Sequence, residues 1–152
     1  MNLNSMPGTP EASVIDLPNF LPYRLAVATD AVSGRLARRY REEFDLSIPE
    51  WRVMAVLGRY PEISAGDVAA RRAMDKVQVS RAVAQLIRNG HLDRRSDAQD
   101  RRRTVLNLSR TGRDIYQRIV PMARAYEQDL FDRLTPEESE ILMRALSRLS
   151  GP

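Results

Sequence analysis

The sequence predicts a mainly α-helical (α+β) fold: six helices and one two-stranded β-ribbon, in the order four helices, two strands, two helices. Apolar residues recur every three or four positions over most of the 152 residues, which is the period of an amphipathic helix. Three segments carry a helix-opening signature, a Ser or Thr followed three residues later by an acid. Residues 92–108 depart from the helical period, because two short β-compatible runs flank a polar stretch there.

The first predicted helix runs from about Pro18 to Phe44. Pro22 is tolerable because it falls in the opening turn, where a missing N–H has no helical partner to lose. Residues 1–16 contain Pro7 and Gly8 and suggest a flexible tail. The helix is marked by one apolar stripe: Leu21, Leu25, Ala28, Val32, Leu36 and Tyr40.

Capping boxes predict the starts of three further helices. Ser47–Glu50 opens the second helix, which ends before Pro61, and Ser64–Asp67 opens a short third helix that stops near Ala73. Thr135–Glu138 opens the last helix, with proline at its first position. The last helix has its own apolar stripe: Ile141, Leu142, Ala145, Leu146 and Leu149.

The middle of the chain predicts a helix followed by a β-hairpin. After a break at Met74-Asp75 the fourth helix spans Lys76–Asn89 and stops at Gly90, because glycine adopts the left-handed cap at no steric cost. Leu92–Arg95 and Thr104–Leu108 then form two strands around an arginine-rich tip.

The fifth helix, which Ser109 can cap, contains an internal proline. Pro121 removes the hydrogen bond to the Gln117 carbonyl, so either two helices meet there or one long helix kinks. The apolar stripe continues in phase across the proline, which favours the kink. The stripe consists of Ile115, Ile119, Met122, Tyr126 and Leu130.

Composition excludes several classes of chemistry. The chain has no cysteine, so disulfides, thiolate zinc sites and thiol redox sensing are absent. His91 is the one histidine, and we interpret it as a polar residue at a helix-to-strand corner. Without a nucleophile–base pair, a metal cluster or a phosphate-binding glycine loop, we expect neither an enzyme nor a cofactor. No apolar run approaches the ~18 residues of a membrane span, and the N-terminus lacks a secretory signal, so we expect a cytoplasmic protein.

Positive charge is concentrated in the middle of the chain. Residues 71–113 hold twelve basic and four acidic residues, a net charge of +8. The whole chain carries +4, so the remainder sums to −4. A basic middle in an acidic remainder is the electrostatic footprint of a polyanion site.

A short helix, a tight break and a second helix with a polar outer face form a helix-turn-helix. Such a second helix enters the major groove of DNA with its N-terminal residues against the base edges. Val79 also belongs, with Val83 and Leu86, to the apolar back of this helix. The candidate major-groove residues are Lys76, Gln78, Val79, Ser80, Arg81 and Gln85.

The arginine-rich hairpin tip suits the minor groove, whose negative potential attracts arginine. We expect Asp100 to brace this tip by accepting a charge-assisted hydrogen bond from a neighbouring arginine. The candidate residues of this wing are Arg94, Arg95, Asp100, Arg101, Arg102 and Arg103.

These motifs resemble the signature of the MarR family of winged helix-turn-helix transcriptional regulators. The resemblance is carried by Leu86–Arg95, by Asp97–Arg102 and by Leu106–Gly112, with Ser109 where threonine is commoner. It implies a homodimer on double-stranded DNA, in most cases as a repressor. It also assigns the minor groove to Arg102 and the bracing role to Asp100.

The resemblance further implies a division of the chain. Residues 17–46 and 111–152 would form a helical dimerisation region, and residues 47–110 the DNA-binding domain. The end helices carry apolar stripes beyond what the central domain needs, which agrees with a dimer. Packing of these helices within one chain is the alternative.

Relatives of this kind release DNA on binding a small aromatic or acyl effector. The candidate effector residues are Tyr23, Arg24, Trp51, Arg52 and Met54. The alternative is that Trp51 and Met54 belong to the core. For the whole protein, the alternative function is a winged-helix protein–protein interaction module whose basic wing meets an acidic partner.

Overall fold

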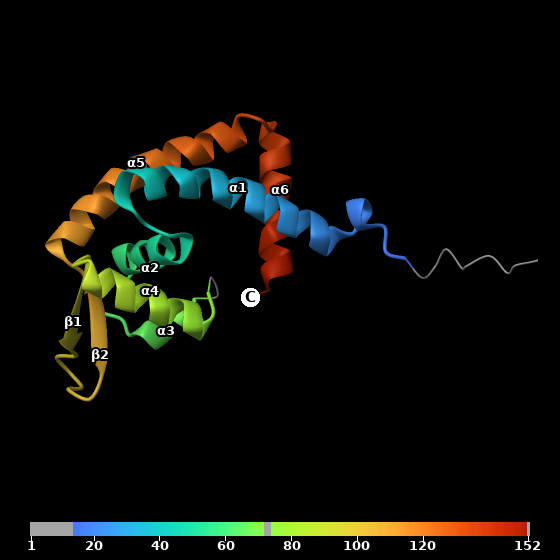
Figure 1. The fold of residues 1–152 in the computed structure, drawn as a ribbon. Coiled ribbons are helices and arrows are strands. Elements are labelled where there is room, and N and C mark those ends of the chain that lie inside the picture. The colour runs from blue at the N-terminus through green and yellow to red at the C-terminus, as the bar shows by residue number, and fades with distance from the viewer. Residues whose placement is uncertain (1–13, 72–73, 152) are drawn as a thin grey trace, which may run out of the picture. The chain divides into compact units, whose positions relative to one another are not determined.

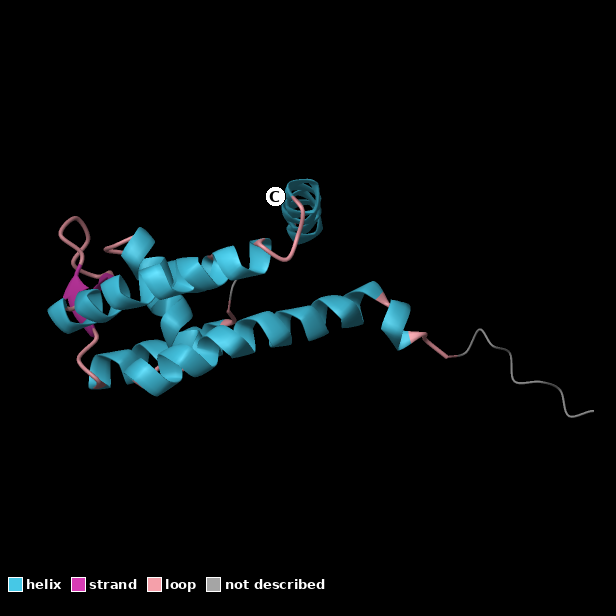
Figure 2. Cartoon of the chain, turned by 90° about the horizontal axis from the view of Figure 1, so that it is seen from above, coloured by secondary structure: helices cyan, strands magenta, loops and turns pink. Residues whose placement is uncertain are grey.

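The computed structural model describes residues 14–71 and 74–151. These residues form two compact units, the first ending at Arg35 and the second beginning at Leu36. The six predicted helices and the two-stranded ribbon are confirmed in their predicted order (Figures 1 and 2). The elements are a 3₁₀ turn η2 (Leu17–Asn19), α1 (Leu21–Phe44), α2 (Ile48–Arg59), α3 (Ala65–Ala70), α4 (Lys76–Arg88), β1 (Leu92–Ser96), β2 (Thr104–Leu108), α5 (Arg110–Phe131) and α6 (Pro136–Ser150).

Helix ends differ from the prediction by a few residues. The first helix begins at Leu21 and not at Pro18, because η2 occupies the preceding residues. The third helix ends at Ala70; its predicted end, near Ala73, lies outside the described residues, as does most of the 1–16 tail. Strand β1 extends one residue further than predicted, to Ser96.

Local capping signals are confirmed. The capping boxes that open α2, α3 and α6 have both reciprocal hydrogen bonds, and Ser109 caps α5. Gly90 has a φ of 73°, in the left-handed region that favours glycine. The break before α4 is itself a cap: the Asp75 carboxylate accepts from the Gln78 N–H at 2.8 Å.

Helix α5 continues through Pro121, so the alternative of two helices meeting there is wrong. Figure 1 shows α5 as one curved ribbon. Curvature is the expected response of a helix that loses one backbone hydrogen bond and must accommodate a proline ring.

The β-ribbon is antiparallel, with Leu92 opposite Leu108 and Ser96 opposite Thr104. A segment before α3 adds to it: Ile63 pairs with Leu106, and the Leu106 N–H donates to the Ile63 carbonyl at 2.9 Å. The Glu62 N–H donates to the side-chain oxygen of the buried Asn107 at 3.1 Å. The base of the ribbon is therefore anchored to the chain that enters α3.

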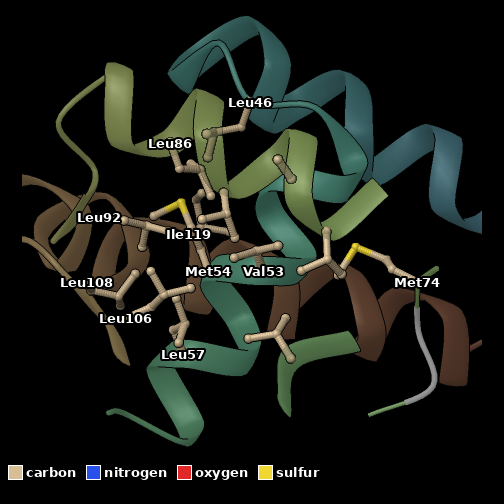
Figure 3. Close-up of a cluster of buried hydrophobic side chains, with 14 of the residues drawn as sticks. Leu46, Val53, Met54, Leu57, Met74, Leu86, Leu92, Leu106, Leu108 and Ile119 are labelled. Atoms are coloured by element: carbon tan, nitrogen blue, oxygen red, sulfur yellow. The ribbon is translucent and has the colours of Figure 1, made fainter. Parts of the chain in front are cut away.

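The core of the second unit lies where α2, α4, β2 and α5 meet. Figure 3 shows the side chains of Met54, Leu106 and Ile119 in one buried cluster. Each fully buried side chain of this size contributes about 1.5–3 kcal/mol relative to exposure. This cluster holds the helix-turn-helix and the ribbon in one body.

Two glycines allow close approach within this body. A Cβ on Gly58 would overlap the ring of Tyr116, and a Cβ on Gly112 would overlap the backbone carbonyl oxygen of His91. His91 lies between α4 and β1, at the predicted helix-to-strand corner.

The last helix keeps its apolar face exposed. No residue of α6 is buried. The exposed large apolar residues are Ile141, Leu142, Met143, Leu146 and Leu149. None of the described helices is long and apolar enough to span a membrane.

Candidate nucleic-acid interface

Helix α4 presents two different faces. Val79, Ala82, Val83 and Leu86 are buried against the core of the second unit. Four of the predicted major-groove residues are exposed on the other side: Lys76, Gln78, Ser80 and Arg81. The structure therefore brings donors of four chemical kinds, an ammonium, an amide, a hydroxyl and a guanidinium, to the open side of one helix.

The prediction that Val79 contacts the major groove is contradicted by its burial. Its side chain is 1% exposed, so it is part of the core and cannot contact a base edge. Val77, which is not among the predicted groove residues, is 59% exposed in the first turn of α4. Helical periodicity could have separated the two valines, because two residues along a helix are about 200° apart.

Gln85 is half-buried and already engaged. Its amide nitrogen donates to the Asn89 side chain at 3.0 Å, and its amide oxygen accepts from the Arg88 guanidinium. Its amide groups therefore already have partners among the described residues.

The wing tip is ordered by side chain-to-backbone hydrogen bonds. The Asp97 carboxylate accepts from the Gln99 N–H at 2.8 Å, and the Asp100 carboxylate accepts from the Arg102 N–H at 3.0 Å. The Arg103 N–H donates to the Asp100 carbonyl at 2.9 Å. These bonds form a compact turn beyond the last backbone pair of the two strands, Ser96 opposite Thr104.

Asp100 therefore accepts a hydrogen bond within the wing as predicted, but from a different donor. The acceptor is Asp100, but the donor is the backbone N–H of Arg102 and not an arginine side chain. The guanidinium that braces the wing belongs to Arg103, which donates to Asp67 in α3 and lies 3.9 Å from the Asp97 carboxylate.

Asp67 has two tasks in this arrangement. Its carboxylate accepts from the Ser64 hydroxyl at 2.7 Å and from the Ser64 N–H at 2.9 Å, which closes the cap of α3. These bonds, with a smaller contribution from Arg103, lower the pKa of Asp67. The acid that opens α3 thus also holds the wing.

The remaining wing arginines are exposed and carry no ion pair to any described carboxylate. They are Arg94, Arg95, Arg101 and Arg102. Like charges gathered in this way repel one another unless an anion lies between them, which is the electrostatic requirement that a phosphate backbone meets.

The predicted effector residues have different environments. Met54 is 0% exposed and lies in the core, the alternative that the sequence also allowed, so in this structure it presents no surface to an effector. Trp51 is half-buried between two rings, with centroids 6.0 Å from Tyr40 and 5.9 Å from Tyr116. Burial raises the pKa of Tyr40, while the nearby Arg52 acts against that shift. Tyr23 and Arg24 are exposed near the start of α1, in the first unit.

A cavity of about 320 Å³ opens beside the base of the wing. The Tyr116 ring and the Arg113 guanidinium supply an aromatic wall and a cation. Arg113 also donates to the Leu108 carbonyl at 2.8 Å. The lining residues are Leu57, Gly58, Pro61, Asn107, Leu108, Arg113, Tyr116 and Gln117. Among the described residues, no group of three acidic or histidine side chains is placed to hold a metal ion.

Comparison with known proteins identifies the family. The MarR family signature matches residues 44–103. The crystal structure of a MarR family transcriptional regulator from Silicibacter pomeroyi is 30% identical, covers 94% of this chain and 95% of its own, and has a TM-score of 0.73. The transcriptional regulator HosA of Escherichia coli O127:H6 is 25% identical over 113 residues, which is 74% of this chain and 84% of HosA.

A third relative shares the fold. The structure of Bordetella bronchiseptica BpsR, whose DNA binding is regulated by 6-hydroxynicotinic acid, is 22% identical, covers 91% of this chain and 99% of its own, and has a TM-score of 0.80. HosA and the Silicibacter pomeroyi protein are transcriptional regulators. The chain belongs to the MarR family of winged helix-turn-helix transcriptional regulators that bind DNA.

Proposed function

We propose that this protein is a homodimeric transcriptional repressor that binds a pseudo-palindromic operator and is released from it by a small aromatic or acyl effector. The observation that supports DNA as the partner most directly is the exposed arginine set of the wing, unpaired among the described residues, in one body with the polar face of α4.

In this proposal α4 reads the major groove. Arg81 suits guanine or phosphate and Gln78 suits adenine, because each side chain can form a bidentate pair. Lys76 and Ser80 complete the polar face. Arg102, at the wing tip, enters the minor groove, while Arg103 holds the tip in place.

The dimer would be built by residues 17–46 and 111–152. The exposed apolar face of α6 supports this assignment, because a second copy lying against it would cover its leucines. Two-fold symmetry would place two α4 helices about 34 Å apart, one turn of DNA, as a pseudo-palindrome requires.

The effector would be a small aromatic or acyl carboxylate. BpsR supports this class, because 6-hydroxynicotinic acid is such a compound. The cavity beside the wing, with Tyr116 as a stacking wall and Arg113 as a cation, offers a better site than the buried Met54. Trp51 stacks on the same Tyr116 and would respond to a ligand there.

The test begins with selection of the bound duplex from random DNA, followed by titration of its affinity against salt. We expect log affinity to fall linearly with log salt concentration. The alternative function, a protein–protein module, predicts no salt-dependent duplex binding. Aromatic carboxylates, including 6-hydroxynicotinate, are then screened for release of the duplex and for a change in Trp51 fluorescence; release that survives Arg113→Ala places the effector elsewhere.

A further inference from the structure

Two arginines gather on one exposed tyrosine at the end of α2. The guanidinium of Arg71 lies 3.6 Å from the centroid of the Tyr60 ring, and that of Arg59 lies 5.0 Å from the same centroid. Tyr60 is 38% exposed, and no carboxylate of residues 14–71 and 74–151 forms an ion pair with either arginine. We call these three residues the Tyr60 cluster.

The chemistry of the Tyr60 cluster is that of an anion site. A guanidinium stacked on a ring keeps its N–H donors in its own plane, free for a second partner. The stacking, worth about 0.5–1 kcal/mol at an exposed site, also restricts the side chain before any ligand arrives. Two positive charges held on one ring repel each other, and an oxyanion between their donors relieves that repulsion.

The location of the cluster identifies the anion. Arg71 caps the C-terminus of α3, the first helix of the helix-turn-helix, four residues before the Asp75 cap of α4. In a helix-turn-helix the first helix crosses the DNA backbone while the second lies in the groove. We propose that the Tyr60 cluster binds a backbone phosphate of the operator, outside the bases that α4 reads. This inference rests on the proposed DNA-binding mode.

The test compares salt dependence in matched variants on the selected duplex. Arg71→Ala should lower affinity and reduce the slope of log affinity against log salt by about 0.9, the value for one phosphate contact. Arg59→Ala should also lower affinity and reduce the slope if both arginines share the phosphate charge. Tyr60→Leu, which removes the aromatic ring, should weaken binding, whereas Tyr60→Phe, which keeps the ring, should not. Arg144→Ala, which removes one positive charge from α6, is the control and should leave the slope unchanged.

Replacing the phosphates of the duplex one at a time by neutral methylphosphonates would identify which phosphate the cluster contacts. The wild-type protein should lose affinity at one backbone position where Arg71→Ala loses none. An Arg71→Ala slope equal to the wild-type slope would overturn this inference alone, since the wild-type protein would still bind duplex DNA in a salt-dependent way. Absence of salt-dependent binding by the wild-type protein would instead overturn the proposed function.

A second inference rests on a different observation, the exposed Val77. At 3.6 residues per turn, Val77 lies about 170° from the middle of the buried face of α4, at the centre of its outward surface. Valine is a poorer helix former than alanine by roughly 0.5 kcal/mol, and with 59% of its surface exposed Val77 has little packing to compensate for that cost. Helix propensity and burial therefore give little reason for a valine at this position.

An apolar β-branched side chain in the first turn of a groove-reading helix matches the methyl group of thymine. We infer that Val77 contacts one thymine methyl in each half-site and so helps to determine the operator sequence. Replacing thymines of the operator one at a time by uracil removes only that methyl group. The wild-type protein should lose about fourfold in affinity at one position, the value of one buried methyl group.

Val77→Ala should abolish this preference for thymine over uracil. Lys76→Ala should instead weaken binding to the thymine duplex and to the uracil duplex equally. Because alanine is the better helix former, Val77→Ala should not lower the melting temperature, which separates lost contact from unfolding. Equal wild-type affinity for thymine and uracil at every position would overturn the inference. If Arg81→Ala also left operator binding unchanged, the proposed reading by α4 would fall with it.

Discussion

The Arg103 guanidinium of the wing donates to the Asp67 carboxylate in the first turn of α3, joining residues 36 positions apart in the sequence. An exposed ion pair of this kind adds at most about 1 kcal/mol to folding stability. Its effect is on orientation: it fixes the wing tip relative to the helix-turn-helix, and therefore the proposed minor-groove contact relative to the proposed major-groove contact.

The first prediction separates bracing from phosphate contact. Arg103→Ala should lower operator affinity with little change in salt slope, because Arg103 is occupied by Asp67 and Asp97. Arg102→Ala should reduce the slope by about 0.9, since its guanidinium is free to meet DNA. Salt titrations of both variants decide this; a slope reduced as much by Arg103→Ala as by Arg102→Ala would show that Arg103 leaves Asp67 for the DNA.

The second prediction concerns acid stability. The folded protein holds the pKa of Asp67 below its unfolded value, through Ser64 and Arg103. Asp67 therefore contributes stability that is fully present above the unfolded pKa of about 4 and is lost as pH falls through the lower folded pKa. Melting temperatures from about pH 7 to about pH 3 should show a deficit for Asp67→Asn that shrinks below about pH 4. A deficit independent of pH would mean that the carboxylate charge has no part in the cap.

The third prediction tests the close approach of Gly58 to Tyr116. Gly58→Ala would force a methyl group into the Tyr116 ring, and overpacking of this kind costs about 1–3 kcal/mol. The melting temperature should fall by about 2–4 °C for each kcal/mol. Gly66→Ala is the matched control, because its nearest neighbour would be the Ser64 hydroxyl oxygen at 3.6 Å, an ordinary contact. We expect the control to raise the melting temperature, since alanine is the better residue within a helix.

The fourth prediction tests the dimer. Leu146→Glu places a charge on the exposed apolar face of α6 and should shift the protein to a monomer in analytical ultracentrifugation, with unchanged helical circular dichroism and weaker operator binding. Arg144→Ala alters the net charge by the same amount and breaks only the exposed pair with Glu140. A dimer that survives Leu146→Glu would place the interface elsewhere.

The fifth prediction concerns Pro121. Alanine at this position restores an N–H that can donate to the Gln117 carbonyl and removes the ring, so α5 should straighten and gain up to about 3 kcal/mol of stability. If the curvature of α5 sets the distance between the two α4 helices of the proposed dimer, Pro121→Ala should change the preferred spacing of half-sites in DNA selection. Unchanged operator affinity and spacing would limit Pro121 to a local role.

Features that depend on neighbouring residues were predictable from the sequence. The capping boxes, the Ser109 cap and the left-handed Gly90 each require only a few consecutive residues with the right side chains. The start of α4 at Lys76 was predicted, and the Asp75 cap was equally local, but Asp75 was interpreted as part of a break and not as the cap of the helix.

Features that join distant segments were not predictable. Nothing in the spacing of Ile63 and Leu106 indicates that they pair, because a bridge across 43 residues depends on how α3 and α4 pack. The partner of Arg103 was missed for the same reason. For Met54 the sequence leaves both an effector contact and the core open, because an apolar side chain on an amphipathic helix has the same local pattern in both roles; only its burial in the structure places it in the core.

The close approach of Gly112 to His91 has a consequence for signal transmission. The His91 carbonyl accepts from the Ser109 N–H at 3.0 Å, and the Ser109 hydroxyl donates to the Gly90 carbonyl at 2.6 Å. With no side chain at Gly112, the backbone that ends α4 lies directly on the backbone that begins α5. No side chain separates the two helices at this junction, so in the proposed release mechanism a displacement of α5 would be passed directly to α4.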